Sequence, residues 1–124
     1  MIPQRVQRRR TVGWRAPEGA RYVGRGTRFG NPWVVTQTRD AWAVNWTGPR
    51  GERQQARPAF YGFTDRRTAH EKAVAYYRQW LHARPDMVAR VRAELAGRDL
   101  MCWCPDGLPC HADVLLAVAR GENP

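Results

Sequence analysis

The chain has 124 residues, 43% of them hydrophobic, and a formal net charge of +10. This length suits one domain with one hydrophobic core, so we expect a single domain over residues 1–124, and the hydrophobic content excludes a chain that is disordered throughout. No apolar run approaches the roughly 20 residues that cross a bilayer, and the first residues lack the apolar stretch of a signal peptide. We therefore expect a cytoplasmic protein with no membrane partner, and the sequence indicates no particular oligomeric state.

Arginine supplies almost all of the positive charge, since only one of the 21 basic residues, Lys72, is a lysine. The planar guanidinium binds phosphate and carboxylate through two hydrogen bonds, so an arginine-rich surface indicates an anionic partner such as a nucleotide or nucleic acid. The codon preference of a GC-rich genome is an alternative explanation for the total. Clustering is more informative, because residues 5–28 contain one acid, Glu18, against eight arginines. These are Arg5, Arg8, Arg9, Arg10, Arg15, Arg21, Arg25 and Arg28.

The first half of the chain has the pattern of short strands and loops. Residues 1–19 indicate a short basic strand or arm followed by turns, and residues 20–24 have the aromatic and β-branched content of a strand. Glycines follow this strand and make the next segment a loop. Two β-rich runs, 33–38 and 41–47, predict a hairpin, and the polar segment 48–58 predicts an exposed and flexible loop.

The second half alternates helices with one strand. An apolar face indicates a helix over residues 66–83, and Asp86 is placed to cap a second helix that runs to Leu95. An apolar run, 99–104, predicts a buried strand, and residues 111–120 predict a last helix. Strands that alternate with helices predict an α/β fold, which we expect to be a small Rossmann-like fold of two or three layers with a β-hairpin insertion.

Three cysteines and a histidine form the pattern C-x-C-x5-C-H at Cys102, Cys104, Cys110 and His111. An odd number of cysteines in one short segment argues against a disulfide framework and predicts reduced thiols. In a strand, Cys102 and Cys104 point to one face while Trp103 points to the core on the other. A set of three cysteines and one histidine suits tetrahedral zinc, although paired zinc-binding cysteines usually have about two to four residues between them. The pattern does not commit the chain to a cofactor but allows zinc, and packing in the core is the alternative for Cys102.

Cys110 and His111 lie where a loop becomes a helix, and the positive end of a helix lowers a thiol pKa and attracts anions. Asp113, two positions later, is placed to cap this helix, to orient the imidazole or to accept a ribose hydroxyl. These three residues are the candidate catalytic groups. We interpret His70 and His82, on the predicted long helix, as surface residues.

The glycine-rich segment 24–32 follows a predicted strand, and its backbone amides and arginines are suited to holding a phosphate. It matches neither the dinucleotide-binding motif G-x-G-x-x-G nor a Walker loop. An alternative is that Trp14, Trp33 and the arginines near them stack single-stranded bases. The candidate ligand-binding residues are Arg10, Arg25, Arg28, Gly30, Asn31 and Cys104.

Distinctive motifs lie in several segments spread along the chain: Arg5–Trp14, Tyr22–Arg25, Gly30–Trp33, Leu100–Pro105 and Pro109–Leu115. Together these segments resemble a small bacterial and phage family, the domain of unknown function 4326. The likeness covers nearly the whole chain apart from residues 48–58, and it implies the domain boundaries and the position of the site more than a reaction. A more distant likeness is to Rossmann-like nucleotide-binding proteins such as the cytokinin-riboside-phosphate hydrolases, which bind nucleotides in loops after strands. The chain lacks their P-G-G-x-G-T-x-x-E signature, so their catalytic acid has no counterpart here.

Three functions fit these features. The first is a nucleotide- or nucleoside-binding protein, with hydrolase or transferase activity as its enzymatic form, in which the arginine-glycine loop faces Cys110, His111 and Asp113. The second is a non-catalytic binder of nucleic acid or of a nucleotide signal, and the third is a zinc-stabilised interaction module. We favour the first, because a local Cys/His/Asp cluster is more than phosphate binding requires.

Overall fold

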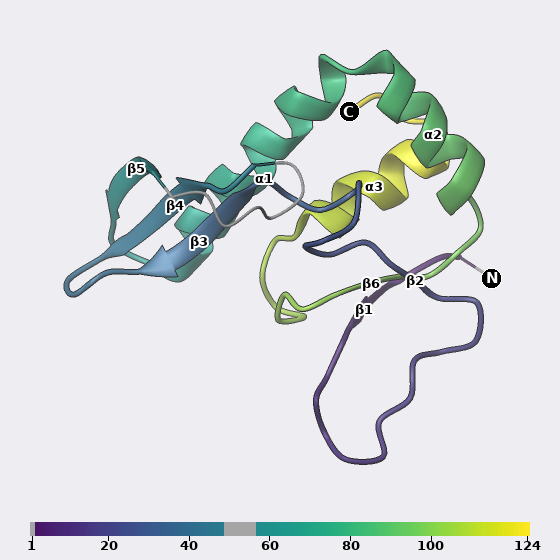
Figure 1. Cartoon of the computed structure of the whole chain (residues 1–124), viewed down its shortest axis with the longest axis horizontal. Coiled ribbons are helices and arrows are strands. Elements are labelled where there is room, and N and C mark those ends of the chain that lie inside the picture. Colours follow the sequence, from purple (N-terminus) through teal and green to yellow (C-terminus); the bar gives the residue numbers. More distant parts are fainter. Residues whose placement is uncertain (1, 49–56) are drawn as a thin grey trace.

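The computed structural model describes residues 2–48 and 57–124, with only the backbone described for 57–61. It confirms a mixed α/β chain (Figure 1). Its elements are β1 (Arg5–Gln7), β2 (Arg21–Tyr22), β3 (Trp33–Gln37), β4 (Trp42–Trp46), β5 (Arg57–Phe63), α1 (Arg66–His82), α2 (Pro85–Leu95), β6 (Leu100–Cys102) and α3 (His111–Ala119). No helix in the described part of the chain is long and apolar enough to cross a membrane.

A parallel three-stranded sheet with the order β1-β6-β2 forms one half of the structure. β6 pairs with both of its neighbours, so that Val6 and Tyr22 each lie opposite Met101. All three residues of β6 are buried, as expected of a central strand in a parallel sheet. Because the strands run in the same direction, their carboxyl ends meet at one edge, and the segments that leave β2 and β6 start side by side.

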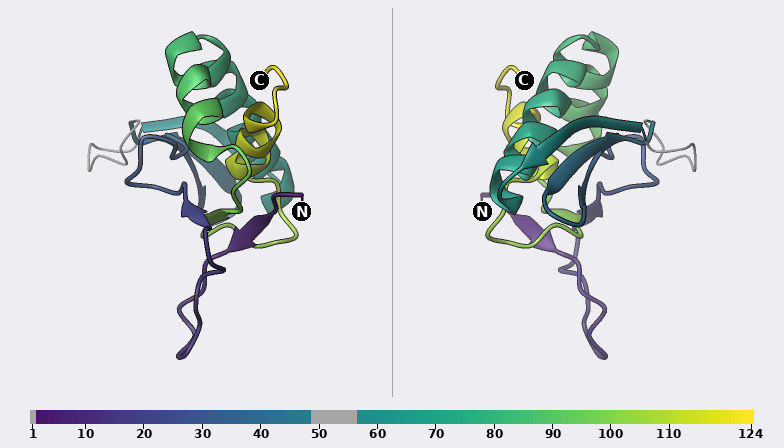
Figure 2. Two further views of the ribbon diagram at one scale, coloured as in Figure 1. Left: turned by 90° about the vertical axis from the view of Figure 1, so that its right-hand side faces the viewer. Right: turned by 90° about the vertical axis from the view of Figure 1, so that its left-hand side faces the viewer.

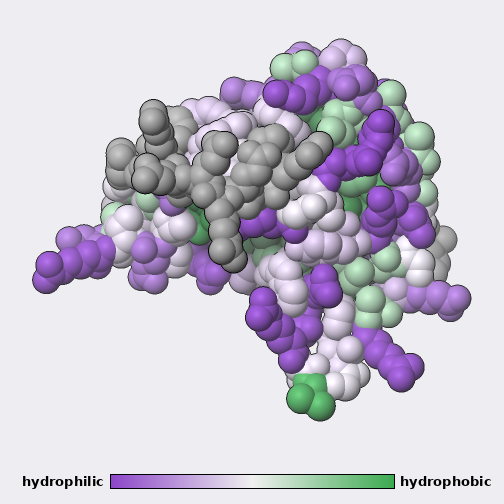
Figure 3. All heavy atoms as spheres, viewed as in Figure 1, coloured by the Kyte–Doolittle hydropathy of each residue, from purple (hydrophilic) through white to green (hydrophobic). Residues whose placement is uncertain are grey.

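The segment between β1 and β2 projects from the body of the protein (Figures 1 and 2). Most of residues 8–20 are exposed, and Val12 is completely exposed. In Figure 3 the projection has a hydrophobic tip and hydrophilic side chains along its flanks. The basic arm that the sequence predicts over residues 1–19 is therefore divided between the strand β1 and this exposed segment.

A second, antiparallel sheet has the order β3-β4-β5. β3 and β4 form the predicted hairpin, with Val35 opposite Val44. β5 corrects the sequence analysis, which assigns no strand to residues 57–63. Pairing with β4 stabilises this strand, and the composition of the segment does not reveal such a partner. Most of the predicted loop 48–58 lies outside the described residues, and its last two residues belong to β5.

Helix α1 packs on the antiparallel sheet, and α3 packs on the parallel sheet. Asp65 caps α1, because its carboxylate accepts a hydrogen bond from the Thr68 backbone N–H at 2.8 Å. α2 begins at Pro85 with Arg84 at the N-cap, so Asp86 lies in the first turn and is not the predicted cap. Proline suits this position because the first amides of a helix have no partner within it.

A buried hydrogen bond connects α1 to the loop that follows β2. Tyr77 is fully buried in the main hydrophobic cluster, and its hydroxyl donates to the Phe29 carbonyl oxygen at 2.7 Å. Burial raises the pKa of Tyr77, so the phenol keeps its proton and remains a donor. This hydrogen bond therefore holds the loop that follows β2 against α1.

We expect Tyr77→Phe to lower the free energy of unfolding by about 1–2 kcal/mol, because the buried Phe29 carbonyl loses its donor. Tyr22→Phe is a matched control. The Tyr22 hydroxyl donates to the Arg25 carbonyl oxygen at 3.1 Å in an exposed position, and its loss should change stability by less than about 0.5 kcal/mol. Urea unfolding, monitored by circular dichroism, measures the free energy of unfolding of both variants. An equal decrease in the two variants would contradict the importance of the buried hydrogen bond.

Candidate functional site

A cavity of about 650 Å³ opens at the carboxyl ends of β2 and β6. This volume lies within the roughly 300–1,000 Å³ that is usual for small-ligand sites. Its walls come from the turns that follow β2 and β6, from β3, from the first turns of α1 and from the start of α3. Segments that are far apart in the sequence therefore meet at the edge where the parallel strands end.

The arginine-glycine loop and the cysteine segment line this same cavity. Arg25 and Asn31 contribute from the loop, and Cys104, Cys110 and His111 contribute from the segment after β6. The backbone of β2 and β6 positions both groups, because each begins within a few residues of a strand end. The two segments that the sequence analysis expects to face each other thus line one cavity.

The other candidate residues do not line the cavity: Arg10, Arg28, Gly30 and Asp113. Arg28 forms an ion pair with Glu94, with 3.8 Å between the nitrogen and oxygen atoms. The Arg10 guanidinium lies 4.9 Å from the ring centroid of Trp103. A direct ligand-binding or catalytic role for these four residues stays a prediction.

Gly30 allows the loop that carries Arg25 to close on itself. Its N–H donates to the Thr27 carbonyl oxygen at 3.1 Å, and a Cβ built on Gly30 would lie 2.8 Å from the Gly24 carbonyl oxygen. Only glycine permits so close an approach between two backbone segments. The residue therefore shapes the loop from outside the cavity.

Asn31 ties this loop to two other elements. Its Nδ2 donates to the Ala73 carbonyl oxygen of α1 at 3.2 Å. Its Oδ1 accepts a hydrogen bond from the Trp33 N–H at the start of β3, at 2.9 Å. Since both ends of the amide have protein partners, the side chain holds the cavity wall in place.

The sulfur atoms of Cys102, Cys104 and Cys110 all lie within 4.8 Å of one another. Cys102 Sγ and Cys110 Sγ are 2.9 Å apart, and both residues are buried, whereas Cys104 is partly exposed. Hydrogen bonds with Cys102 and Cys110, together with the nearby Arg5 cation, lower the pKa of Cys104. Hydrogen bonds within the group and burial raise the pKa of Cys102 and Cys110. The three thiols therefore form one interacting group.

His111 is buried below the cavity, with its Nε2 atom 2.8 Å from the Val23 carbonyl oxygen. A carbonyl oxygen only accepts hydrogen bonds, so Nε2 carries the proton and Nδ1 is the acceptor of the neutral ring. Nδ1 lies 3.6 Å from Cys110 Sγ. Burial is the main cause that lowers the pKa of His111, which keeps the ring neutral near neutral pH.

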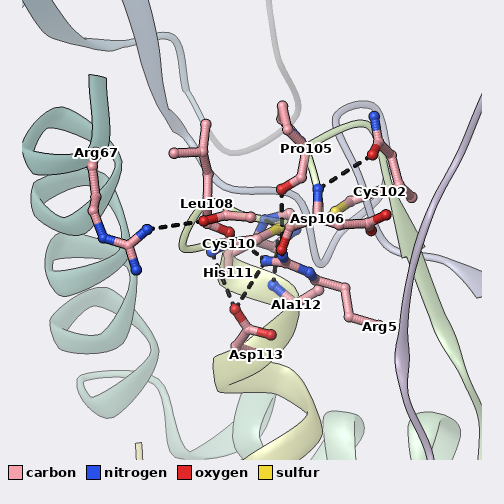
Figure 4. A network of polar contacts seen from close by, with 12 residues as sticks. Arg5, Arg67, Cys102, Pro105, Asp106, Leu108, Cys110, His111, Ala112 and Asp113 are labelled. Carbon is pink, nitrogen blue, oxygen red and sulfur yellow. Dashed lines mark hydrogen bonds and ion pairs between the residues drawn. The ribbon is translucent and has the colours of Figure 1, made fainter. Parts of the chain in front are cut away.

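One guanidinium holds the turn between β6 and α3 (Figure 4). Arg5, on β1, has only 11% of its side chain exposed and donates to the backbone carbonyl oxygens of Pro105, Asp106 and Leu108. It also pairs with Asp113, whose carboxylate accepts from the Cys110 N–H and so completes a capping box at the start of α3. These contacts give Asp113 a structural role.

Trp103 corrects the sequence analysis, which places its ring in the core. The side chain is 39% exposed and lines the cavity. The guanidinium groups of Arg8 and Arg10 lie 5.1 Å and 4.9 Å from its ring centroid, and Arg8 also lies over the ring of Tyr22. The strand ends at Cys102, so the alternation of faces from which the core position was inferred does not extend to Trp103.

Arg66 and His70 are cavity residues that the sequence analysis does not identify. Both lie on the first turns of α1 and line the cavity, and His70 is partly buried, not a surface residue as predicted. Burial lowers the pKa of His70. Their spacing of four residues is a signal that could have found them, because it places two side chains on one face of a helix.

The Gly30→Ala variant should lose about 1–3 kcal/mol of stability, because the added methyl group meets a backbone carbonyl that cannot rotate away. Gly107→Ala is the control. Apart from Gly107 itself and its two chain neighbours, no described heavy atom lies within 4 Å of a Cβ built there, and the expected change is below about 0.5 kcal/mol. Thermal unfolding of the two variants provides the comparison, and a stable Gly30→Ala protein would argue against the close backbone approach.

Replacing Arg5 with lysine should cost about 2–3 kcal/mol of unfolding free energy, because an ammonium group cannot reach the carbonyl oxygens on both sides of the turn. Arg9→Lys is a control with the same chemical change. Arg9 is half-exposed, and its one ion-pair partner among the described residues is Asp106, at 3.4 Å, so its replacement should cost less than about 0.5 kcal/mol. Urea unfolding measures the free energy of unfolding of both variants. A similar decrease in Arg5→Lys and Arg9→Lys would show that the contacts of Arg5 contribute no more to stability than those of Arg9.

A family model described as Domain of unknown function (DUF4326) matches residues 6–121 of the chain. No curated protein and no solved structure matches the chain. The matched residues include every side chain that lines the cavity and most of β1. The chain therefore belongs to the DUF4326 family.

Proposed function

We propose that the protein binds a nucleotide or nucleoside in the cavity at the ends of β2 and β6. The observation that carries this proposal is the composition of the wall, which combines two arginines with aromatic rings and includes no Asp or Glu among the described lining residues. We interpret the β1-β6-β2 sheet as a small Rossmann-like unit, since ligands of such sheets bind beyond the carboxyl ends of parallel strands.

Arg25 and Arg66 are the groups suited to a phosphate. Among the described residues Arg25 has no ion-pair partner, and the Arg66 guanidinium contacts the ring of Trp42 at 5.6 Å from its centroid. An uncompensated guanidinium in a partly enclosed wall favours an anionic ligand. The start of α3 is less suited to this role than the sequence analysis expects, because Cys110 and Asp113 already cap it.

Aromatic rings supply the surface for a base. Trp103 and Tyr22 lie on the wall formed by the strand ends, and Trp33 lies on the wall formed by β3. Stacking of a base on one such ring is worth about 1–3 kcal/mol. Trp103 is the best placed of the three, because it is the most exposed of these rings.

If the protein is a hydrolase or transferase, two residues that line the cavity, Cys104 and His111, are the groups suited to take part in the reaction. Hydrogen bonds with Cys102 and Cys110 lower the pKa of the Cys104 thiol, and neutral His111 offers Nδ1 as a proton acceptor. Asp113 is paired with Arg5 and is therefore not included. The free thiols also suit a reducing compartment, which supports a cytoplasmic location.

Calorimetric titration with adenosine and AMP tests the proposal, because the two ligands differ by one phosphate. We expect Arg25→Ala to weaken AMP binding by about 10- to 100-fold and to change adenosine binding little. Trp103→Ala should weaken the binding of both ligands. Arg120→Ala is the matched control, since Arg120 is exposed, lies outside the cavity and pairs with Glu122. The same effect of Arg25→Ala and Arg120→Ala on AMP binding, or no binding of either ligand, would overturn the proposal.

Single-stranded nucleic acid is the second candidate ligand, favoured by the stack of Arg8, Trp103 and Arg10 beside the projecting segment. Arginine and aromatic groups on one exposed surface are typical of proteins that bind single strands. In this case a short oligonucleotide would bind with a steep dependence on salt concentration, and AMP would not bind. Fluorescence anisotropy at two salt concentrations separates the two candidates.

A further inference from the structure

The three cysteines of the chain form one compact group of ligand atoms. Cys102 is the last residue of β6, Cys104 lies in the turn that follows, and Cys110 is the N-cap of α3. The position of each is determined by a different contact: strand pairing for Cys102, the Arg5 hydrogen bonds for the turn, and helix capping for Cys110. Such independent support is typical of a site whose geometry matters.

We propose that Cys102, Cys104 and Cys110 bind one zinc ion through their thiolates and leave a fourth coordination position open toward the cavity. All three residues line the cavity, so an ion that they hold would face it. Zinc sites with three protein ligands and one open position are typical of catalysis, whereas four protein ligands close a structural site. The proposal does not depend on which ligand occupies the cavity.

The spacing of the sulfur atoms suits one metal ion. At a zinc–sulfur distance of about 2.3 Å, tetrahedral geometry places the sulfur atoms of two ligands about 3.8 Å apart. The three sulfur atoms here lie within 4.8 Å of one another, with two of them at 2.9 Å, so small side-chain rotations bring all three to one ion. A four-iron cluster needs more space, because each cysteine binds a different iron atom. Thiolate ligands favour zinc over magnesium or calcium.

His111 is not a member of this group. Among the described His, Cys, Asp and Glu side chains, the three cysteines are the group whose ligand atoms all lie within 4.8 Å of one another. The His111 ring is held by its bond to the Val23 carbonyl oxygen, and Nδ1 contacts Cys110 Sγ. The sequence allows a zinc site with four ligands, but the structure favours three cysteine ligands. His111 then lies beside one of these ligands, Cys110, and does not bind the metal itself.

The surroundings suit the charge of such a site. Three thiolates and one zinc ion together carry one negative charge, and the Arg5 guanidinium, which is only 11% exposed, lies behind the turn. Arg25 and Arg66 add positive charge on the cavity side. The Cys110 sulfur also accepts a hydrogen bond from the Ala112 N–H at 3.5 Å, as a thiolate can. No Asp or Glu is among the described residues that line the cavity.

The test starts with protein purified under reducing conditions, whose zinc content is measured and whose affinity for Zn²⁺ is determined by competition with a chromophoric chelator. We expect one zinc per chain. Cys104→Ser should weaken the affinity by more than about 100-fold, which exceeds the effect of most changes outside the ligand set. His70→Gln is the cavity control, and His111→Gln keeps a donor for the Val23 carbonyl oxygen. Both should retain zinc, and circular dichroism verifies that each variant is folded.

Cobalt substitution tests the open position without any nucleotide. Co²⁺ bound by three thiolates gives sulfur-to-metal charge-transfer absorption, and added azide should shift its visible bands by occupying the fourth position. A spectrum that azide leaves unchanged, or loss of zinc in His111→Gln, would overturn the three-ligand site. A Cys102–Cys110 disulfide in the reduced preparation, found by thiol counting, would also overturn it. The nucleotide proposal would survive each of these results, because its test measures AMP binding.

Discussion

The guanidinium of Arg5 connects the first strand of the protein to the turn on which the candidate site depends. It satisfies three backbone carbonyl oxygens between Pro105 and Leu108 and pairs with Asp113 at the start of α3. A turn of this kind has few hydrogen bonds of its own, so a nearly buried cation with several donors holds it in one conformation. Hydrogen bonds with Cys102 and Cys110 lower the pKa of Cys104, and the same cation adds to this effect. Arg5 therefore contributes to both the structure and the electrostatics of the site.

Parallel pairing determines where the cavity lies. β6 is enclosed by β1 and β2, and the turns that leave β2 and β6 emerge at the same edge of the sheet. One turn brings Arg25 and the other brings Trp103 and the thiols, so cationic, aromatic and sulfur groups line a single cavity. The two proposals share this cavity, because Trp103 and the three cysteines all line it.

The arginines of the basic N-terminal segment, residues 5–28, have different structural roles. Arg5 supports a turn, Arg28 pairs with Glu94, Arg8 and Arg10 lie over aromatic rings, and Arg25 faces the cavity. Guanidinium groups suit all of these roles because they combine charge, several donors and a planar surface. A count of arginines therefore indicates an anionic partner only weakly, whereas the position of each guanidinium determines which of them are available to a ligand.

Local patterns in the sequence determined the helices, the hairpin and the compact Cys/His segment, because helix periodicity, turn residues and cysteine spacing act between near neighbours. The tertiary structure decided the rest. Arg5 meets Leu108, which is 103 positions away, and the strand β5 depends on β4 for its hydrogen bonds. Sequence patterns placed Trp103 in the core and missed His70 at the cavity, because exposure depends on what other segments cover. Only the pairing of β6 between two distant strands decided which of the candidate side chains face one another.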